Sequence, residues 1–352
     1  MSKLQITIGK KDLANAAAKG AIAPQDVENL WDHLVQAKTA VDSTEAPKAG
    51  FDFAQLAWYA GGVLVMIAMA WFMERAGNAF GTGAVFALSL AYGAGFAGLG
   101  YKLSFKDGHK VPGGLLFVLS VLMVPLAVVV GLDASQLAAK MNGSQIALIA
   151  EASALGVGLL AISKVRSSLL AMPIFGALWL ASMTIADMVA RPYWGPIFGF
   201  TSNAYLMTSM AIGMGILAIA FVTDSKLGRS EDYSWWGYLF GVAAFWIPLS
   251  MLDSGSELGK LAYFGVNVLF MLTSVVLARK VFLYAGAIGS IYYVGHVLWT
   301  YFAQSMAFPA ILIAVGLGII YLGVQYRKRQ AFIEGYVTGL IPEGLRKHLP
   351  RA

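Results

Sequence analysis

The stretch that decides the fold is VFLYAGAIGSIYYVGHVLWTYFAQSMAFPAILIAVGLGIIYLGVQY, residues 281–326. It contains no Asp, Glu, Lys or Arg, and His296 is its only side chain that titrates near neutral pH. Because about 20 apolar residues are enough to cross a bilayer, the stretch predicts two membrane crossings joined by a turn at Gln304 and Ser305. Basic residues stand on both sides of it, namely Arg279, Lys280, Arg327, Lys328 and Arg329.

The composition of the whole chain is that of a membrane protein. Of its 352 residues 58% are hydrophobic and 12% are charged, against about 25% charged residues in soluble domains. So little charge cannot cover a water-facing surface. The net charge is +6, but the basic residues lie in short segments between apolar spans, so we expect no nucleic-acid partner. A sequence without cysteine also excludes disulfides, thiol catalysis and thiolate metal sites.

Apolar spans recur along the chain and predict an all-α fold, a polytopic membrane bundle of about ten transmembrane helices. The fourth span is interrupted by Glu151, and the ninth shares a very short turn with the tenth, so the fourth and the ninth are the least regular. The expected crossings are residues 54–73, 79–101, 112–132, 144–163, 167–190, 202–223, 233–252, 258–278, 281–303 and 306–326.

The basic residues predict how the helices are oriented. With a cytoplasmic N-terminus, 21 of the 25 Lys and Arg residues fall in cytoplasmic segments. Because cytoplasmic loops carry the excess of Lys and Arg, we expect an N-in, C-in topology. The outer segments then hold Arg75, Lys140, Arg191 and Lys260.

Two polar segments flank the transmembrane domain, which spans residues 51–326. Residues 1–50 predict a cytoplasmic helical hairpin and linker, in which Pro24 opens the second helix. Residues 327–352 predict a basic amphipathic tail on the cytoplasmic face, with a solvated tail as the alternative. The expected contacts with anionic lipid head groups are Arg327, Lys328, Arg329, Arg346 and Lys347.

Glu151 and His296 are the candidate polar site within the membrane. A carboxylate in hydrocarbon is costly, so Glu151 is expected to face the bundle interior, to be neutralised or to be paired. Its functional roles would be proton carrier, cation ligand or substrate contact; its structural role would be to lock helices together. His296 is expected at a similar depth, where a Glu–His pair could relay protons. The alternative is a histidine bonded to a tyrosine or a backbone carbonyl.

Asp187 and Arg191 are four residues apart and predict an ion pair at the outer boundary of the membrane. The sequence has no glycine-rich phosphate loop, no HExxH, no GxSxG and no histidine cluster. We therefore expect no metal site and no cofactor, and the sequence identifies no catalytic residue.

The layout resembles a family of uncharacterised bacterial membrane proteins that begin with a short cytoplasmic helical segment. The residues that carry the resemblance are KGAIAPQDVENLWDHL (Lys19–Leu34), LAWYAGGVLVMIAMAWF (Leu56–Phe72) and LIPEGLRKHLP (Leu340–Pro350). The resemblance implies a multi-pass protein of the bacterial inner membrane, and it implies no activity.

Three functions remain open. The sparse charge within the crossings favours a non-catalytic accessory, scaffold or assembly subunit that contacts a partner protein, or a second copy of itself, through glycine-rich helix faces. The first alternative is a proton-linked carrier of small molecules or ions that uses Glu151 and His296. The second alternative is a membrane-embedded enzyme, which the missing motifs disfavour.

Overall fold

The computed structural model describes residues 53–190, 202–227, 232–252 and 255–329, with residues 13, 17, 23 and 26–33 near the N-terminus. The chain divides into two compact units, Met1–Trp58 and Tyr59–Ala352. In the first unit a helix covers residues 26–33, where Pro24 predicts one. The N–H of Asp26 donates to the Ala23 carbonyl at 2.9 Å as this helix begins. Most of the predicted hairpin and linker lies outside the described residues.

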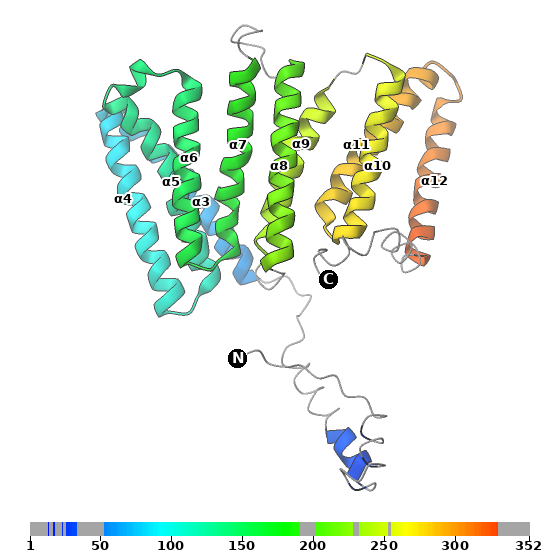
Figure 1. Ribbon diagram of the computed structural model, residues 1–352, viewed down its shortest axis with the longest axis horizontal. Coiled ribbons are helices and arrows are strands. Elements are labelled where there is room, and N and C mark those ends of the chain that lie inside the picture. The colour runs from blue at the N-terminus through cyan, green and yellow to red at the C-terminus, as the bar shows by residue number, and fades with distance from the viewer. Residues whose placement is uncertain are drawn as a thin grey trace. The chain divides into compact units, whose positions relative to one another are not determined.

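The rest of the described chain is helical, and every predicted crossing coincides with a helix. From α4 to α9 each helix packs beside the next, as do α10 and α11, and these helices run up and down (Figure 1). The all-α fold is therefore confirmed. The α-helices are α3 (Phe53–Phe80), α4 (Thr82–Tyr101), α5 (Lys110–Ala134), α6 (Gly143–Lys164), α7 (Ala171–Ala190), α8 (Asn203–Leu227), α9 (Ser234–Met251), α10 (Glu257–Leu277), α11 (Lys280–Phe302) and α12 (Phe308–Lys328).

Eight of these helices, counted over the described residues, are long and apolar enough to cross a membrane. They are α3 to α8, α10 and α11. Helix α9 is 18 residues long and begins with the sequence SWWGY, whose aromatic and polar side chains suit an interface better than hydrocarbon. In α12 the apolar run Phe308–Gly318, whose side chains the structure describes without a gap, is shorter than a crossing. The structure thus shows a multi-pass membrane protein, and the count of ten and the orientation stay predictions.

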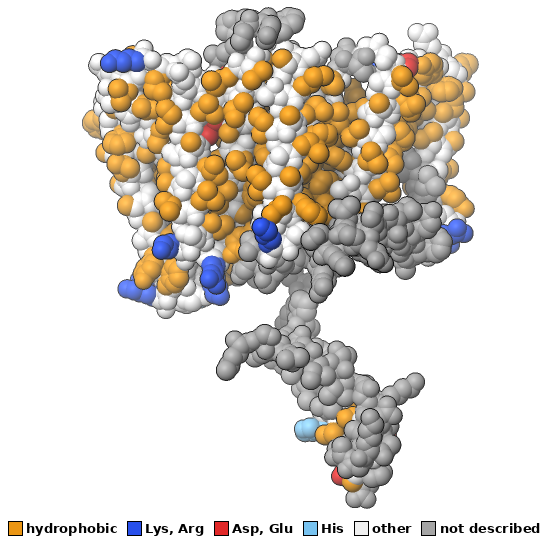
Figure 2. Space-filling model, in the orientation of Figure 1, with side chains coloured by type: hydrophobic (Ala, Val, Ile, Leu, Met, Phe, Trp, Pro, Cys, Tyr) orange, Lys and Arg blue, Asp and Glu red, His pale blue; other side chains and the backbone are white. Residues whose placement is uncertain are grey.

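The outer surface of the helices is apolar along most of their length. Hydrophobic side chains cover the visible face of the helices in Figure 2, and Lys and Arg side chains appear near the helix ends. Large side chains such as Leu64, Leu160 and Ile313 are more than 60% exposed to the surroundings of the protein. A patch of this extent would be unstable in water, so its surroundings are lipid.

Sequential hairpins form the packing units of the bundle. Helices α4 and α5, α6 and α7, α8 and α9, and α10 and α11 pack as neighbouring pairs, and α9 also contacts α7 and α11. Glycine permits the closest approach, because a Cβ at Gly213 of α8 would lie 2.7 Å from the backbone nitrogen of Phe245 in α9. Ser209 of α8 also donates to the Ala244 carbonyl of α9 at 3.2 Å. Small residues therefore bring these backbones together, as in other membrane helix pairs.

Candidate functional site

Glu151 lies in the middle of α6 and faces α7. The Thr184 hydroxyl of α7 donates to Glu151 Oε1 at 2.8 Å, so the side chain links the two helices. The second carboxyl oxygen, Oε2, is buried and has no hydrogen-bond partner among the described residues. Glu151 thus joins two helices, as its structural role predicts, and still has one oxygen able to bind a proton or a donor.

Glu151 lines a cavity of about 240 Å³ between α5, α6, α7 and α9. The other walls are apolar, and they include the rings of Trp179 and Phe240, which stack with centroids 5.6 Å apart. Pro125 of α5 and Pro173 of α7 contribute further apolar surface. Within such walls a carboxyl group is expected to be a neutral acid that can give up or accept a proton.

His296 lies on α11 and borders a different cavity. Its Nδ1 is 3.5 Å from the Thr300 hydroxyl one turn further along α11. Its Nε2 is enclosed by protein and lies 3.9 Å from Glu257 Oε1, too far for a hydrogen bond. The cavity beside it has a volume of about 480 Å³ and is formed by the end of α9, the start of α10 and the second half of α11.

The two candidate residues therefore lie in separate places. None of the residues that line the cavity at Glu151 also lines the cavity at His296. Helices α7, α8 and α9 stand between α6 and α11 in Figure 1. Similar depth in the membrane was the basis for expecting a Glu–His pair, and depth does not determine which helices are neighbours. The structure shows no direct proton relay between these two residues.

The predicted pair of Asp187 and Arg191 is only half described. Asp187 Oδ2 accepts a hydrogen bond from Ser144 Oγ at 3.1 Å, and this bond ties the end of α7 to the start of α6. Arg191 lies outside the described residues, so its pairing with Asp187 stays a prediction.

The predicted lipid contacts lie at the end of α12 and beyond it. Lys328 and Arg329 are exposed there, as a contact with lipid head groups requires. The side chain of Arg327 is outside the described set, and so are Arg346 and Lys347. The interaction of this tail with lipid stays a prediction.

A buried ion cluster was missed by the sequence analysis, which treated Arg279 as a basic loop residue. The Arg279 guanidinium donates to Asp224 from Nε at 3.1 Å and from Nη2 at 2.6 Å. It also donates to Asp232 from Nη1 at 2.5 Å. The side chains of Arg279 and Asp224 are 7% and 0% exposed, whereas Asp232 is 39% exposed. The cluster fastens the end of α8 and the start of α9 to the turn between α10 and α11.

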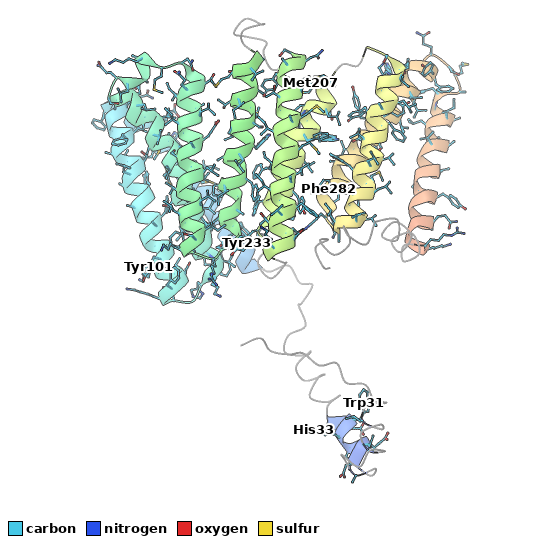
Figure 3. The ribbon with its side chains drawn as sticks, in the orientation of Figure 1. Trp31, His33, Tyr101, Met207, Tyr233 and Phe282 are labelled. Carbon is cyan, nitrogen blue, oxygen red and sulfur yellow. The ribbon has the colours of Figure 1, made fainter. Side chains whose placement is uncertain are left out.

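The surroundings of Arg279 keep it charged. Burial alone would lower the pKa of Arg279, but hydrogen bonds and charge from Asp224 and Asp232 raise that pKa above its usual value. The guanidinium carbon also lies 5.4 Å from the centre of the Tyr238 ring, within range of a cation–π interaction. The Tyr238 ring packs against Phe282, labelled in Figure 3, with centroids 5.5 Å apart.

One signal in the sequence could have pointed to this cluster. Asp224 occupies the last turn of α8, where the helix dipole disfavours an acid and favours a base. An acid in that position, at the end of an apolar span, requires a nearby cation. The sequence does not reveal which of the basic residues supplies the charge.

A second missed feature is the amide of Asn267, which is fully buried on α10. Trp246 of α9 donates from its indole N–H to Asn267 Oδ1 at 2.8 Å. The Asn267 amide N–H donates to the Tyr263 carbonyl at 2.8 Å. Gly289 of α11 leaves room for this amide, because a Cβ there would collide with it. One polar side chain thus joins α9, α10 and α11.

The fold and these polar links define the class of the protein, which is a multi-pass α-helical membrane protein. Comparison with protein-family models, with curated proteins and with solved structures finds no match. Across the described residues, no group of three or more His, Asp or Glu side chains is placed to hold a metal ion. Any more specific function therefore has to be argued from the structure itself.

Proposed function

We propose that the protein is a non-catalytic scaffold or assembly subunit whose helix α4 packs against α4 of a second copy in the membrane. The observation that supports this most directly is a stripe of small residues on the outward face of α4. A Cβ placed at Gly83, Gly95 or Gly98 would meet no atom within 4 Å. Ala87 and Ala91 are exposed on the same face.

Packing within the chain does not explain this stripe. Gly100 of α4 differs, since a Cβ there would lie 3.1 Å from the Gly113 carbonyl of α5. The outward glycines contact nothing comparable, although each costs a helix about 0.5–1 kcal/mol relative to alanine. The spacing of positions 83, 87, 91, 95 and 98 puts them along one side of the helix. Small residues at this spacing allow close pairing of helices in lipid.

The polar residues favour a scaffold over a carrier. Asn267, Glu151 and Arg279 each connect different helices through hydrogen bonds. Glu151 and His296 line different cavities, so a shared pathway through both has no geometric support. These connections suit a rigid body that presents its outer helix faces to neighbours.

The proposal includes an N-in, C-in orientation in a bacterial inner membrane, as the resemblance implies. Basic residues at the turns α4–α5, α6–α7 and α10–α11 support it, since these turns would share one side of the membrane if every helix from α3 to α12 crossed it. The N-terminal helical segment and the basic tail would then be cytoplasmic, the tail next to anionic lipid. The basic residues of these turns are Lys102, Lys106, Lys110, Lys164, Arg166, Arg279 and Lys280.

Cross-linking tests the scaffold directly, because the natural sequence contains no cysteine. In an isologous dimer the variant Gly95→Cys places two thiols near the symmetry axis, so oxidation in native membranes should give a covalent dimer. The matched control is Gly265→Cys on α10, another exposed glycine whose Cβ would meet nothing within 4 Å. Equal cross-linking of both variants, or a monomer in both cases, would contradict the proposal.

The carrier remains the second candidate because Glu151 lines a cavity and its Oε2 has no hydrogen-bond partner among the described residues. In this case, protein reconstituted into proteoliposomes should conduct protons, and Glu151→Gln should abolish the conductance. The control Thr184→Val removes the bond to Oε1 and keeps the carboxyl group. Unchanged conductance in Glu151→Gln would exclude this candidate.

A further inference from the structure

Five basic side chains form a patch at two neighbouring turns, α4–α5 and α6–α7. All five are exposed, and none forms an ion pair with a residue that the structure describes. Asp107, also exposed, is the single acidic residue in the sequence of these two turns, so five positive charges face one negative charge. The members of this basic patch are Lys102, Lys106, Lys110, Lys164 and Arg166.

The beginning of α5 holds the two turns side by side. A Cβ at the buried Gly113 would lie 2.9 Å from the backbone nitrogen of Ser104, in the α4–α5 turn. A Cβ at the buried Gly114 would lie 2.5 Å from Ser167 Oγ, in the α6–α7 turn. Because neither glycine has a side chain, both turns pack closely on α5, and the basic residues of one turn lie next to those of the other.

The local backbone directs the charged side chains away from the core. Val165 is only 9% exposed and its backbone is extended, so the neighbouring Lys164 and Arg166 project to the opposite side, where both are exposed. Lys110 lies one helical turn before Gly114 and therefore on the side of α5 that faces the α6–α7 turn. The cations of the two turns thus border one common surface.

Aromatic side chains indicate the depth of this surface in the membrane. Tyr101 and Phe105 are 55% and 54% exposed, and their ring centroids are 5.0 Å apart. Tyr101 lies at the end of the helical bundle in Figure 3. Exposed aromatic rings of this kind collect at the level of the lipid head groups. Lys102 and Lys106 directly follow the two aromatic residues, so their ammonium groups lie at the level of the lipid phosphates.

We infer that the basic patch binds an anionic phospholipid whose head group carries two phosphates, as in diphosphatidylglycerol. One phosphate lies at the lysines of the α4–α5 turn, and the other lies at Lys164 and Arg166. A guanidinium can bind a phosphate through two parallel N–H bonds. The acyl chains lie against apolar side chains that are exposed on α4 and α6, such as Leu99 and Leu160. The inference is independent of the proposed scaffold, of contacts through α4 and of the orientation in the membrane.

Native mass spectrometry of the full-length protein in a neutral detergent tests this site. The probes are tetraoleoyl diphosphatidylglycerol, with two phosphates, and dioleoyl phosphatidylglycerol, with one. We expect the two-phosphate lipid to bind more tightly. The double variant Lys110→Gln with Arg166→Gln removes one cation from each turn and should weaken its binding about thirtyfold, because each basic residue contributes about fivefold.

The matched control removes the same amount of charge elsewhere. Lys226 and Lys280 are exposed at the ends of α8 and α10–α11, outside the patch. The double variant Lys226→Gln with Lys280→Gln should bind diphosphatidylglycerol as the natural protein does. An equal loss in both double variants would show attraction to net charge alone and would overturn the inference. So would equal affinity for the two lipids.

A soluble probe distinguishes a lipid site from a general phosphate site. Inorganic diphosphate carries the two phosphates without acyl chains, and it should not displace bound diphosphatidylglycerol at an equal concentration. Displacement at that concentration would show that the patch binds phosphate from solution, and the assignment to a lipid would then be wrong.

Discussion

Arg279 and Asp224 form a two-point ion pair between residues 55 positions apart in the chain, with contacts of 2.6 and 3.1 Å. The pair joins the hairpin of α8 and α9 to the hairpin of α10 and α11. Both side chains are buried, so water does not solvate either group and each needs the other as its partner. The first prediction follows from this dependence.

Replacing Arg279 by methionine should destabilise the protein by about 3–5 kcal/mol, because the buried carboxylate of Asp224 loses its partner. Thermal unfolding in detergent measures the effect. Asp232→Asn should cost less than about 1 kcal/mol, since Asp232 is 39% exposed and solvent screens its charge. The double variant Arg279→Met with Asp224→Asn should recover part of the loss. A single variant Arg279→Met that unfolds like the natural protein would contradict this account.

The pH dependence of the same pair has a definite sign. The pKa of Arg279 is raised in the folded protein, so its stabilising contribution is complete below the pKa of the unfolded chain and decreases only above it. The stability difference between the natural protein and Arg279→Met should thus stay constant from neutral pH to about pH 10. Thermal unfolding across this range measures it. A difference that shrinks on moving from neutral to mildly alkaline pH would show that the guanidinium does not carry the effect.

Gly289→Ala should destabilise the protein by about 1–3 kcal/mol. The new methyl group would displace the Asn267 amide, which then loses its bond from the Trp246 indole. Gly295→Ala on the same helix is the control, because a Cβ there meets nothing within 4 Å, and it should be neutral or slightly stabilising. The measurement is a comparison of the melting temperatures of Gly289→Ala and Gly295→Ala. Equal values would mean that the Asn267 amide does not stabilise the packing of α9, α10 and α11.

Glu151 should react with a lipid-soluble carbodiimide and resist a water-soluble one. The reaction adds the acid O–H across a C=N bond of the reagent to give an O-acylisourea, so it requires a neutral carboxyl group that the reagent can reach. Mass spectrometry of peptides locates the adduct, and Glu151→Gln must abolish it. Equal labelling by both reagents would show that Glu151 faces water, and no labelling would show that its cavity is closed to molecules from the bilayer.

The orientation is tested by impermeant maleimides on single-cysteine variants in intact cells. Lys140→Cys, in the α5–α6 connection, should be labelled from outside. Lys106→Cys, between α4 and α5, should be labelled only after the cells have been lysed. Both backgrounds lack other thiols, because the sequence contains no cysteine. The reverse pattern would invert the proposed topology.

The positions of the helices could be predicted from the sequence because each span is a continuous apolar run, as in residues 281–326. Lateral neighbours could not be predicted. Apolar runs reveal depth and direction, whereas the neighbours of a helix depend on which faces fit one another. A similar depth for Glu151 and His296 therefore left a direct contact between them open, and the structure shows that they line different cavities.

The ion cluster could not be predicted for the same reason, because its members lie on helices whose lateral packing the sequence does not reveal. Arg279 fits the positive-inside pattern so well that nothing in the linear sequence calls for a second explanation. Its true partner, Asp224, comes two helices earlier, after α8 has begun its last turn. The packing of α9 against α11 brings the α8–α9 turn and the α10–α11 turn together.

The separation of this pair along the chain has a consequence for biosynthesis. Asp224 leaves the ribosome 55 residues before Arg279, so α9 and α10 must be made while the carboxyl group has no guanidinium beside it. During that interval the end of α8 has to stay in the aqueous margin of the membrane, because a carboxylate without a partner is costly in hydrocarbon. The contact between the end of α8 and the turn before α11 can form only after Arg279 has been translated, so the two hairpins that it joins are fastened together late in synthesis.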